Sequence, residues 1–304
     1  MPDLILHHYD LSPFCEKVRL AFGHKGLDWR GVDIPIWPPR PDFSPLTAGY
    51  RRAPALQVGA DVYCDTLLIL REIERRFPEP TLYPGGQVGL ASALSWYADT
   101  TLFIPAAKVV TSIIGDHLPE QFVQDRIDFM KEDFSGSASQ KALPQNRQRV
   151  RAQLTILADM LRDGRPFLLG DALSAADLSA YHVPWFVRKN GGEAAEGLLP
   201  MGPLLPWMER VAAVGHGRKE VMSPEEALEV ARAAEPARVG AFEDAASGLK
   251  GGDAVSILSD AANDPITGTL AYADETEIVI RNEHPRTGVV HTHFPRFGYS
   301  AVAA

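Results

Sequence analysis

The residues best placed to do chemistry lie near the start of the chain, in residues 4–19, LILHHYDLSPFCEKVR. A buried strand is expected to lead through Tyr9 into a helix that begins after Ser12. Serine is a good N-cap, and Pro13 suits the first helical position because its missing N–H costs nothing there. Ser12 and Cys15 therefore lie where free N–H groups meet the positive end of the helix dipole. Such a position can hold an anion or lower the pKa of a thiol.

The elements around this helix are predicted from hydrophobic patterning. A second strand is expected at 27–34, and the proline-rich stretch 35–45 reads as a loop. Two short strands, 55–58 and 61–64, form a β-hairpin, and Asp65 caps a helix that Pro78 ends. The order β-α-β-loop-β-β-α is typical of a thioredoxin-like half-domain.

From Gln87 onward the hydrophobic periodicity is helical, with Pro105 predicting a kink. Ser174 and Asp177 bracket a sequence typical of a capping box. Helices are expected at 87–114, 120–133, 145–163, 203–213 and 224–234.

Beyond Gly248 the sequence changes to short β-rich runs, at 255–258, 267–273, 276–280 and 288–294. They predict a small antiparallel sheet or barrel, too small to be stable alone, that packs against the rest of the protein. Val279 is expected to face outward, and the helix before the module is expected to strap it in place. The residues expected to pack inward are Ile257, Leu270, Ile278, Ile280 and Val290.

Composition excludes several classes of protein. A chain of 304 residues with 45% hydrophobic and 23% charged residues predicts two or three ordinary globular domains. A net charge of −9 argues against general nucleic-acid binding. Two cysteines are too few for a disulfide scaffold. Neither a signal peptide nor an apolar run of ~20 residues is evident. A cytoplasmic protein without a membrane span is therefore expected.

The motifs SPFCEKVR, RRAPAL and CDT occur in that order ahead of a helical region. Together they resemble the soluble glutathione S-transferases, of the serine-type, bacterial-like kind, over roughly the first 220 residues. The resemblance implies an α/β plus all-α fold with an added C-terminal β module. The expected domains are a thioredoxin-like glutathione-binding domain at 1–84, an all-helical domain with an electrophile pocket at 87–222, and a helix with a small antiparallel sheet at 223–304.

The resemblance implies that Ser12 activates glutathione by donating a hydrogen bond to its sulfur. The alternative is a plain N-cap whose hydroxyl is used on the helix. Tyr9 is the rival activator, because tyrosine-type members carry the hydroxyl near the end of the first strand. Cys15 departs from the cysteine-type members, whose nucleophile occupies the position of Ser12, so it is expected to be packed, with a redox role as the alternative.

The remaining glutathione contacts are also implied by the resemblance. Ala53-Pro54 matches the family's cis-proline, whose neighbouring backbone pairs with the cysteinyl part of glutathione. Asp65 and Thr66 would hold the γ-glutamyl end, although Asp is shorter than the usual Glu or Gln and can instead be only a cap.

Charged and aromatic residues complete the expected site. Arg51 and Arg52 would hold the glycine carboxylate, because Arg pairs with carboxylates bidentately, although exposed Arg is common. Trp96 and Phe103 would line the electrophile pocket, the alternative being ordinary core residues.

Histidines near the C-terminus are candidate metal ligands. His291 and His293 alternate on one strand, with His284 as a third candidate ligand. Two histidines on a solvated strand are common, so no metal site is predicted.

The sequence therefore predicts a homodimeric glutathione transferase with glutathione as cosubstrate and a small hydrophobic electrophile as the second substrate. The alternatives are a non-catalytic glutathione-binding or scaffold protein of the same fold, and a thiol–disulfide or glutathionyl exchange enzyme that uses Cys15.

Overall fold

The computed structural model of the chain describes residues 3–240, 242, 244 and 247–304. Two compact units are formed. The first comprises Met1–Tyr9, Leu27–Glu72 and Arg218–Ala304, and the second comprises Asp10–Gly26 and Ile73–Gly217. Each unit draws on segments far apart in the sequence, and the three domain ranges expected above stay a prediction.

The first unit is built on a mixed β-sheet. Strand β1 (Ile5–His8) pairs in parallel with β2 (Asp28–Asp33) and antiparallel with β3 (Ala55–Val58), which forms a hairpin with β4 (Asp61–Cys64). Gly59 has a φ of +64° in the turn of this hairpin, a conformation that favours glycine. The expected strands are confirmed, and together with helices α1 (Pro13–His24) and α2 (Thr66–Arg76) they form the thioredoxin-like N-terminal domain.

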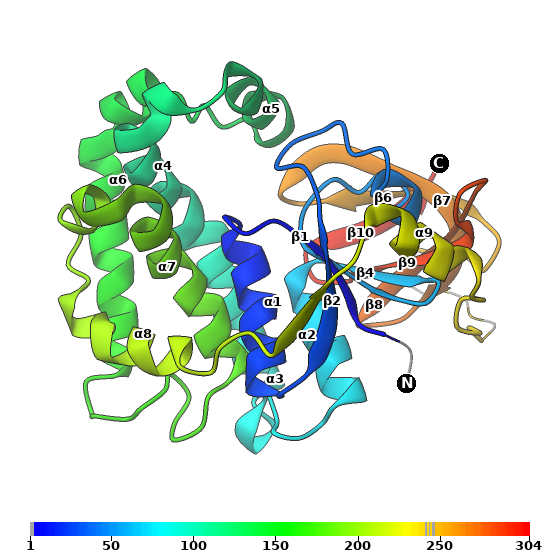
Figure 1. Ribbon diagram of the computed structural model, residues 1–304, viewed down its shortest axis with the longest axis horizontal. Helices are drawn as coiled ribbons and strands as arrows, with labels where there is room; N and C mark the ends of the chain where they lie inside the picture. The colour runs from blue at the N-terminus through cyan, green and yellow to red at the C-terminus, as the bar shows by residue number, and fades with distance from the viewer. Residues whose placement is uncertain (1–2, 241, 243, 245–246) are drawn as a thin grey trace. The chain divides into compact units, whose positions relative to one another are not determined.

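The C-terminal strands continue the same sheet. They are β6 (Ala254–Ser259), β7 (Ala262–Ala273), β8 (Glu277–His284), β9 (Gly288–Pro295) and β10 (Tyr299–Ala303). Their mutual pairings are antiparallel, as expected, but β9 also pairs in parallel with β4 (Figure 1). Among the described residues, these strands and β5 (Arg218–Val221) form one sheet in the order β10-β6-β7-β8-β9-β4-β3-β1-β2-β5.

Two strands have no counterpart in the sequence-based prediction. Strand β5 (Arg218–Val221) pairs in parallel with β2, and all four of its residues are exposed and three are charged. Strand β10 follows the last expected run and pairs with β6. Neither carries the strong apolar alternation by which a strand is recognised in a sequence.

The core of the first unit includes residues of the C-terminal module. The five residues expected to pack inward from the C-terminal module are all buried, and most of them join a cluster with Phe294, Tyr299 and Cys64. Val279, expected to face outward, is instead fully buried, so that expectation was wrong. Helix α9 (Pro224–Arg232) packs Leu228 and Ala231 against residues that include Val290, as the strap prediction requires.

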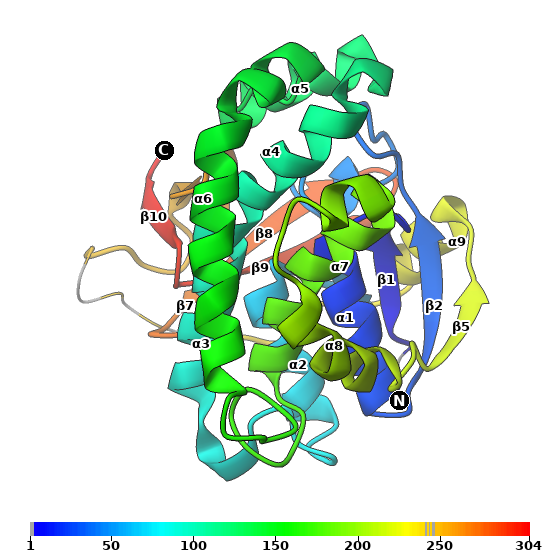
Figure 2. The same ribbon diagram turned by 90° about the vertical axis from the view of Figure 1, so that its left-hand side faces the viewer.

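The second unit is helical. Its helices are α1 (Pro13–His24), α3 (Val88–Trp96), α4 (Phe103–Ile114), α5 (Glu120–Met130), α6 (Gly136–Met160), α7 (Ala175–Glu196) and α8 (Leu205–Ala212). Helix α2 (Thr66–Arg76) begins in the first unit and ends in the second. Helices α4, α6 and α7 lie side by side (Figures 1 and 2), and α1 packs against α7.

The irregularity expected at Pro105 is present, shifted toward the N-terminus. A π-helical segment, Tyr97–Leu102, separates α3 from α4. Pro105 has no N–H to donate to the carbonyl of Thr101 one turn earlier. The side-chain amide of Gln153 donates to that oxygen at 3.0 Å and so replaces the missing bond.

Helix α6 begins nine residues before the expected start at 145. Ser135 is its N-cap, and Pro144 lies inside the helix. The expected start was wrong because the apolar spacing from Val150 onward does not reveal the more polar first turns, and a long, well-packed helix tolerates Pro144 in its interior.

The helical run Val88–His117 has a mean hydropathy of 1.2 over an 18-residue window, so by length and composition alone it could cross a membrane. Of that window, 56% is buried inside the protein. Such burial is typical of a core helix in a helical domain.

Candidate functional site

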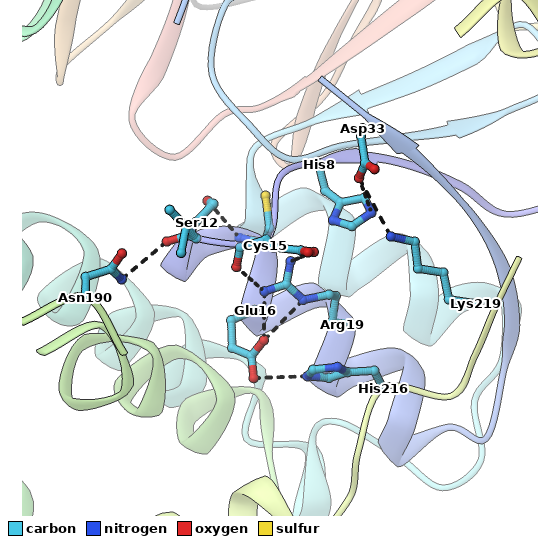
Figure 3. Close-up of polar contacts among 11 residues, drawn as sticks. His8, Ser12, Cys15, Glu16, Arg19, Asp33, Asn190, His216 and Lys219 are labelled. Carbon is cyan, nitrogen blue, oxygen red and sulfur yellow. Dashed lines mark hydrogen bonds and ion pairs between the residues drawn. The ribbon is translucent and has the colours of Figure 1, made fainter. Parts of the chain in front are cut away.

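The N-terminus of α1 carries the predicted activating residue. Ser12 is the N-cap, with an extended backbone, and its Oγ accepts a hydrogen bond from the Cys15 amide at 3.2 Å (Figure 3). Pro13 occupies the first turn, as expected. The capping bond uses an oxygen lone pair, whereas activation of a thiolate would use the O–H proton. The two roles weighed for Ser12 are therefore chemically compatible.

A buried polar cluster holds the loop that leads to Ser12. Arg19 donates through Nη2 to the Asp10 carbonyl at 3.0 Å and to Glu16 Oε2 at 2.8 Å (Figure 3). His216 lies 3.0 Å from the other oxygen of Glu16. Burial opposes ionisation of Glu16, but the hydrogen bond and charge of His216 and the adjacent Arg19 outweigh it and lower the pKa of this carboxyl. This cluster positions the loop ahead of α1, and the sequence analysis did not identify it.

The alternative residues occupy different environments. Cys15 is completely buried, which favours packing, and its exchange role stays a prediction that selective alkylation tests. Tyr9 is partly buried and packs against the cluster that contains Phe43 and Leu46 in the first unit. The role of Tyr9 as the rival activator stays a prediction.

The first unit brings together two of the predicted glutathione-binding residues. Arg52 Nη2 donates to Ser259 Oγ at 2.9 Å, and Nη1 donates to Tyr299 Oη at 3.3 Å. The Tyr299 hydroxyl in turn donates to Asp65 Oδ2 at 3.1 Å. Burial and the charge of Asp65 raise the pKa of Tyr299, so it stays protonated as a donor. Tyr299 of the C-terminal module thus links Arg52 and Asp65. Sequence patterns do not predict this long-range contact.

Asp65 also caps α2, as expected, because its Oδ1 accepts a hydrogen bond from the Leu67 amide at 3.0 Å. Its φ of +71° lies in the left-handed region, which Asp adopts more readily than most residues. Thr66 follows as the first residue of α2 and is buried. The Ala53–Pro54 peptide bond is cis, which confirms the expected cis-proline. Arg51 is partly buried, and its carbonyl oxygen accepts a hydrogen bond from the Arg40 guanidinium.

The residues expected to meet the electrophile lie in the second unit. Phe103 contacts the ring of Phe14 at 5.0 Å between centroids and the ring of Phe186 at 5.5 Å. Trp96 is partly buried on α3. A shallow surface hollow at the end of α6, lined by residues such as Asp159 and Arg165, contains none of the predicted site residues.

Beside this aromatic group lies a buried ion pair that the sequence analysis missed. Lys17 Nζ lies 2.8 Å from both carboxylate oxygens of Asp99, and it also lies 5.7 Å from the Phe14 ring centroid. The buried His182 ring contacts Phe14 as well. Burial, together with the charge of Lys17, lowers the pKa of His182, so the ring is neutral at physiological pH.

Comparison with known proteins agrees with this architecture. Residues 6–81 match the family model of the glutathione S-transferase N-terminal domain, and residues 140–214 match that of the C-terminal domain. The crystal structure of a GST-like protein from Pseudomonas syringae is 35% identical, covers 100% of both chains and superimposes with a TM-score of 0.80.

Two characterised relatives align with part of the chain. FtsZ-localized protein A of Caulobacter vibrioides is 29% identical over 195 residues, which is 59% of this chain and 79% of the relative. Glutathione S-transferase DHAR3, chloroplastic, of Arabidopsis thaliana is 24% identical over 178 residues, 56% of this chain and 54% of the relative. The full-length similarity, the two matched domains and the fold lead to one conclusion: this chain belongs to the glutathione S-transferase superfamily.

Proposed function

We propose that this chain is a cytoplasmic glutathione transferase-like enzyme that activates the glutathione thiol for attack on a small apolar electrophile. The observation that carries the proposal is the position of Ser12 at the N-terminus of α1, where its O–H can donate to a thiolate. The sulfur would form a bond to carbon while a leaving group departs with its electron pair, and the thiol proton would pass to solvent.

The free energy required to activate the glutathione thiol is small. Lowering a thiol pKa from ~8.5 toward 7 corresponds to about 2 kcal/mol. A hydrogen bond to a charged group contributes about 1.5–3 kcal/mol, and a helix N-terminus adds roughly 0.3–1 kcal/mol. One serine hydroxyl at a helix start is therefore sufficient.

The peptide part of glutathione would be held by the residues implied by the family resemblance. The γ-glutamyl end would meet Asp65 and Thr66 at the start of α2, and the glycine carboxylate would meet Arg51 and Arg52. The cysteinyl backbone would pair beside Ala53-Pro54. The electrophile would lie against Trp96 and Phe103.

Replacement of the activating hydroxyl tests the enzyme proposal. Ser12→Ala should lower kcat by about 10²-fold, with a smaller effect on glutathione affinity, because the lost bond acts on the thiolate. Tyr9→Phe is the matched control and should leave kcat nearly unchanged. The reverse result would identify Tyr9 as the activator.

A second candidate function is non-catalytic binding. It is favoured by the relative whose name describes localisation with FtsZ, and by the burial of Ser12, which is only 1% exposed. Retention on immobilised glutathione without conjugation of generic electrophiles, together with co-sedimentation with polymerised FtsZ, would support this candidate. Conjugation that depends on Ser12 would refute it.

We further propose that the protein is a homodimer, since members of this superfamily commonly dimerise around a two-fold axis. The helices at 65–77 and 87–114 would lie near the interface. Light scattering at micromolar concentration should give the mass of two chains, and a monomer mass would contradict the proposal.

A further inference from the structure

Three potential metal ligands meet where the C-terminal strands join the N-terminal sheet. Asp61 lies on β4, and His291 and His293 lie on β9, its parallel neighbour. Asp61 is paired with His291 and Tyr63 with His293 in the strand register, so the three side chains share one face of the sheet. Their exposed fractions are 6%, 7% and 5%.

The spacing of the ligand atoms suits a small divalent cation. Asp61 Oδ1 lies 3.0 Å from His293 Nε2 and 3.8 Å from His291 Nδ1. Zinc bound tetrahedrally by nitrogen and oxygen at ~2.0–2.1 Å keeps its ligand atoms about 3.3 Å apart. The two distances lie on either side of that value, so small side-chain shifts would complete the geometry.

His291 provides an independent indication of a ligand. Its Nδ1 is buried and has no hydrogen-bond partner among the residues that the structure describes. Buried polar atoms are nearly always satisfied, and such an exception requires an explanation. This nitrogen lies 3.8 Å from Asp61 Oδ1, so it is directed at the other proposed ligands.

The other two groups are oriented by outer contacts. The Ala237 amide donates to Asp61 Oδ2 at 2.9 Å and leaves Oδ1 facing the histidines. His293 Nδ1 lies 3.3 Å from Glu277 Oε2, so the ring is placed between two carboxylates. A carboxylate behind a ligating histidine is the usual outer shell of a protein metal site.

We propose that Asp61, His291 and His293 bind a divalent transition-metal ion, with Zn²⁺ as the best fit. The ion would bridge β4 and β9 and so fasten the C-terminal strands to the N-terminal sheet. His284, the third ligand considered from sequence, is directed elsewhere, since its Nδ1 accepts from the Arg286 amide at 3.2 Å.

Without a metal, the same groups form a hydrogen-bonded chain in which His293 is the central donor. Arg281, the cross-strand neighbour of His291, adds a positive charge. A histidine binds metal only as a neutral ring, so Zn²⁺ affinity should fall as the pH is lowered.

Zinc titration of the full-length, metal-free protein with any affinity tag removed tests the proposal, with a chromophoric chelator as competitor. His291→Gln and His293→Gln should each weaken Zn²⁺ binding by about 100-fold or more, and Glu277→Gln by roughly tenfold. His284→Gln is the matched control on the same sheet and should bind like the wild type. Circular dichroism verifies that each variant is folded.

Two further readouts distinguish this site from adventitious binding. Co²⁺ should give visible absorption bands of a low-coordinate nitrogen–oxygen site in the wild type and not in His293→Gln. Saturating Zn²⁺ should raise the Tm by about 5 °C or more. Equal Zn²⁺ affinity in the wild type and in the two ligand variants would overturn the proposal, as would a wild type that binds no Zn²⁺.

Discussion

At the scale of single residues, a buried histidine makes the stability of the first unit depend on pH. His7 on β1 is 1% exposed, and one ring nitrogen lies 2.8 Å from Gln57 Oε1. Burial lowers the pKa of His7 to about 4, against a smaller raising effect of the bond to Gln57. Between the ordinary histidine pKa near 6.5 and this lowered pKa, His7 is protonated in the unfolded chain and neutral in the folded chain.

The free energy of unfolding should therefore fall as the pH is lowered from about 6.5 toward 4, with His7 contributing roughly 3 kcal/mol over the window. His7→Leu should remove this contribution, measured as a flatter dependence of urea unfolding on pH. Phe43→Leu, which changes a ring in contact with His7, is the control and should lower stability without altering the slope. An unchanged slope in His7→Leu would contradict the assignment.

Tyr299 provides a second test at this scale, which rests on the proposed function. Its hydroxyl links Arg52 to Asp65, so Tyr299→Phe should leave both less well positioned for glutathione. We expect the KM for glutathione to rise by about 5–10-fold with kcat nearly unchanged, which corresponds to one hydrogen bond of about 1–1.5 kcal/mol. Tyr272→Phe, which removes an exposed hydroxyl bonded to Asp274, should leave KM unchanged. Equal KM values in both variants would show that Tyr299 has no role in binding.

At the scale of elements, α7 and α9 each begin with a capping box, which is buried in α7 and exposed to solvent in α9. Asp177 at the start of α7 is fully buried and accepts hydrogen bonds from the Leu168 amide, the Ser174 amide and hydroxyl, and Trp207 Nε1. Burial raises the pKa of Asp177 despite these donors. The capping box of α9, formed by Ser223 and Glu226, is exposed to solvent.

Asp177→Ala should lower the free energy of unfolding by roughly 3–5 kcal/mol, because it leaves several buried donors without an acceptor. Ser223→Ala removes an exposed cap and should cost about 1 kcal/mol. Chemical denaturation of both variants measures the difference. Similar losses of unfolding free energy in the two variants would show that burial of the α7 cap adds little to its contribution to stability.

At the scale of the whole molecule, the C-terminal strands are part of the sheet that begins the chain. A protein ending at Ala234 would lose the partner of β4 and the cluster around Phe294 and Tyr299. An exposed sheet edge and uncovered apolar side chains promote aggregation. We expect a fall in Tm of at least several degrees and loss of solubility, measured by calorimetry and light scattering.

Removal of Ala303 and Ala304 alone is the matched control, since both residues are exposed at the end of β10. This shorter truncation should leave the Tm close to that of the wild type. If the long truncation behaved in the same way, the C-terminal strands would not stabilise the sheet.

Hydrophobic spacing, turn residues and caps within the local sequence determined most of the helices and strands. The hairpin at 55–64 was predicted with its observed bounds because alternation and a glycine turn are encoded within a few residues. The capping box of Ser174 and Asp177 and the cap at Asp65 were recognised for the same reason, whereas the capping box of Ser223 and Glu226 was not predicted. Helix α6 was misjudged at its start because the tolerance of Pro144 depends on packing that the local sequence does not contain.

Only the tertiary structure decided how distant segments pair. The parallel contact of β4 with β9 joins residues more than two hundred positions apart, and an apolar pattern specifies the buried face of a strand without specifying its neighbour. The same pairing brings Asp61 to His291 and His293, and the pairing of β10 with β6 accompanies the placement of Tyr299 beside Arg52 and Asp65. Sequence alone singled out His291, His293, Arg52 and Asp65, whereas non-local strand pairing determined that Asp61 and Tyr299 lie beside them.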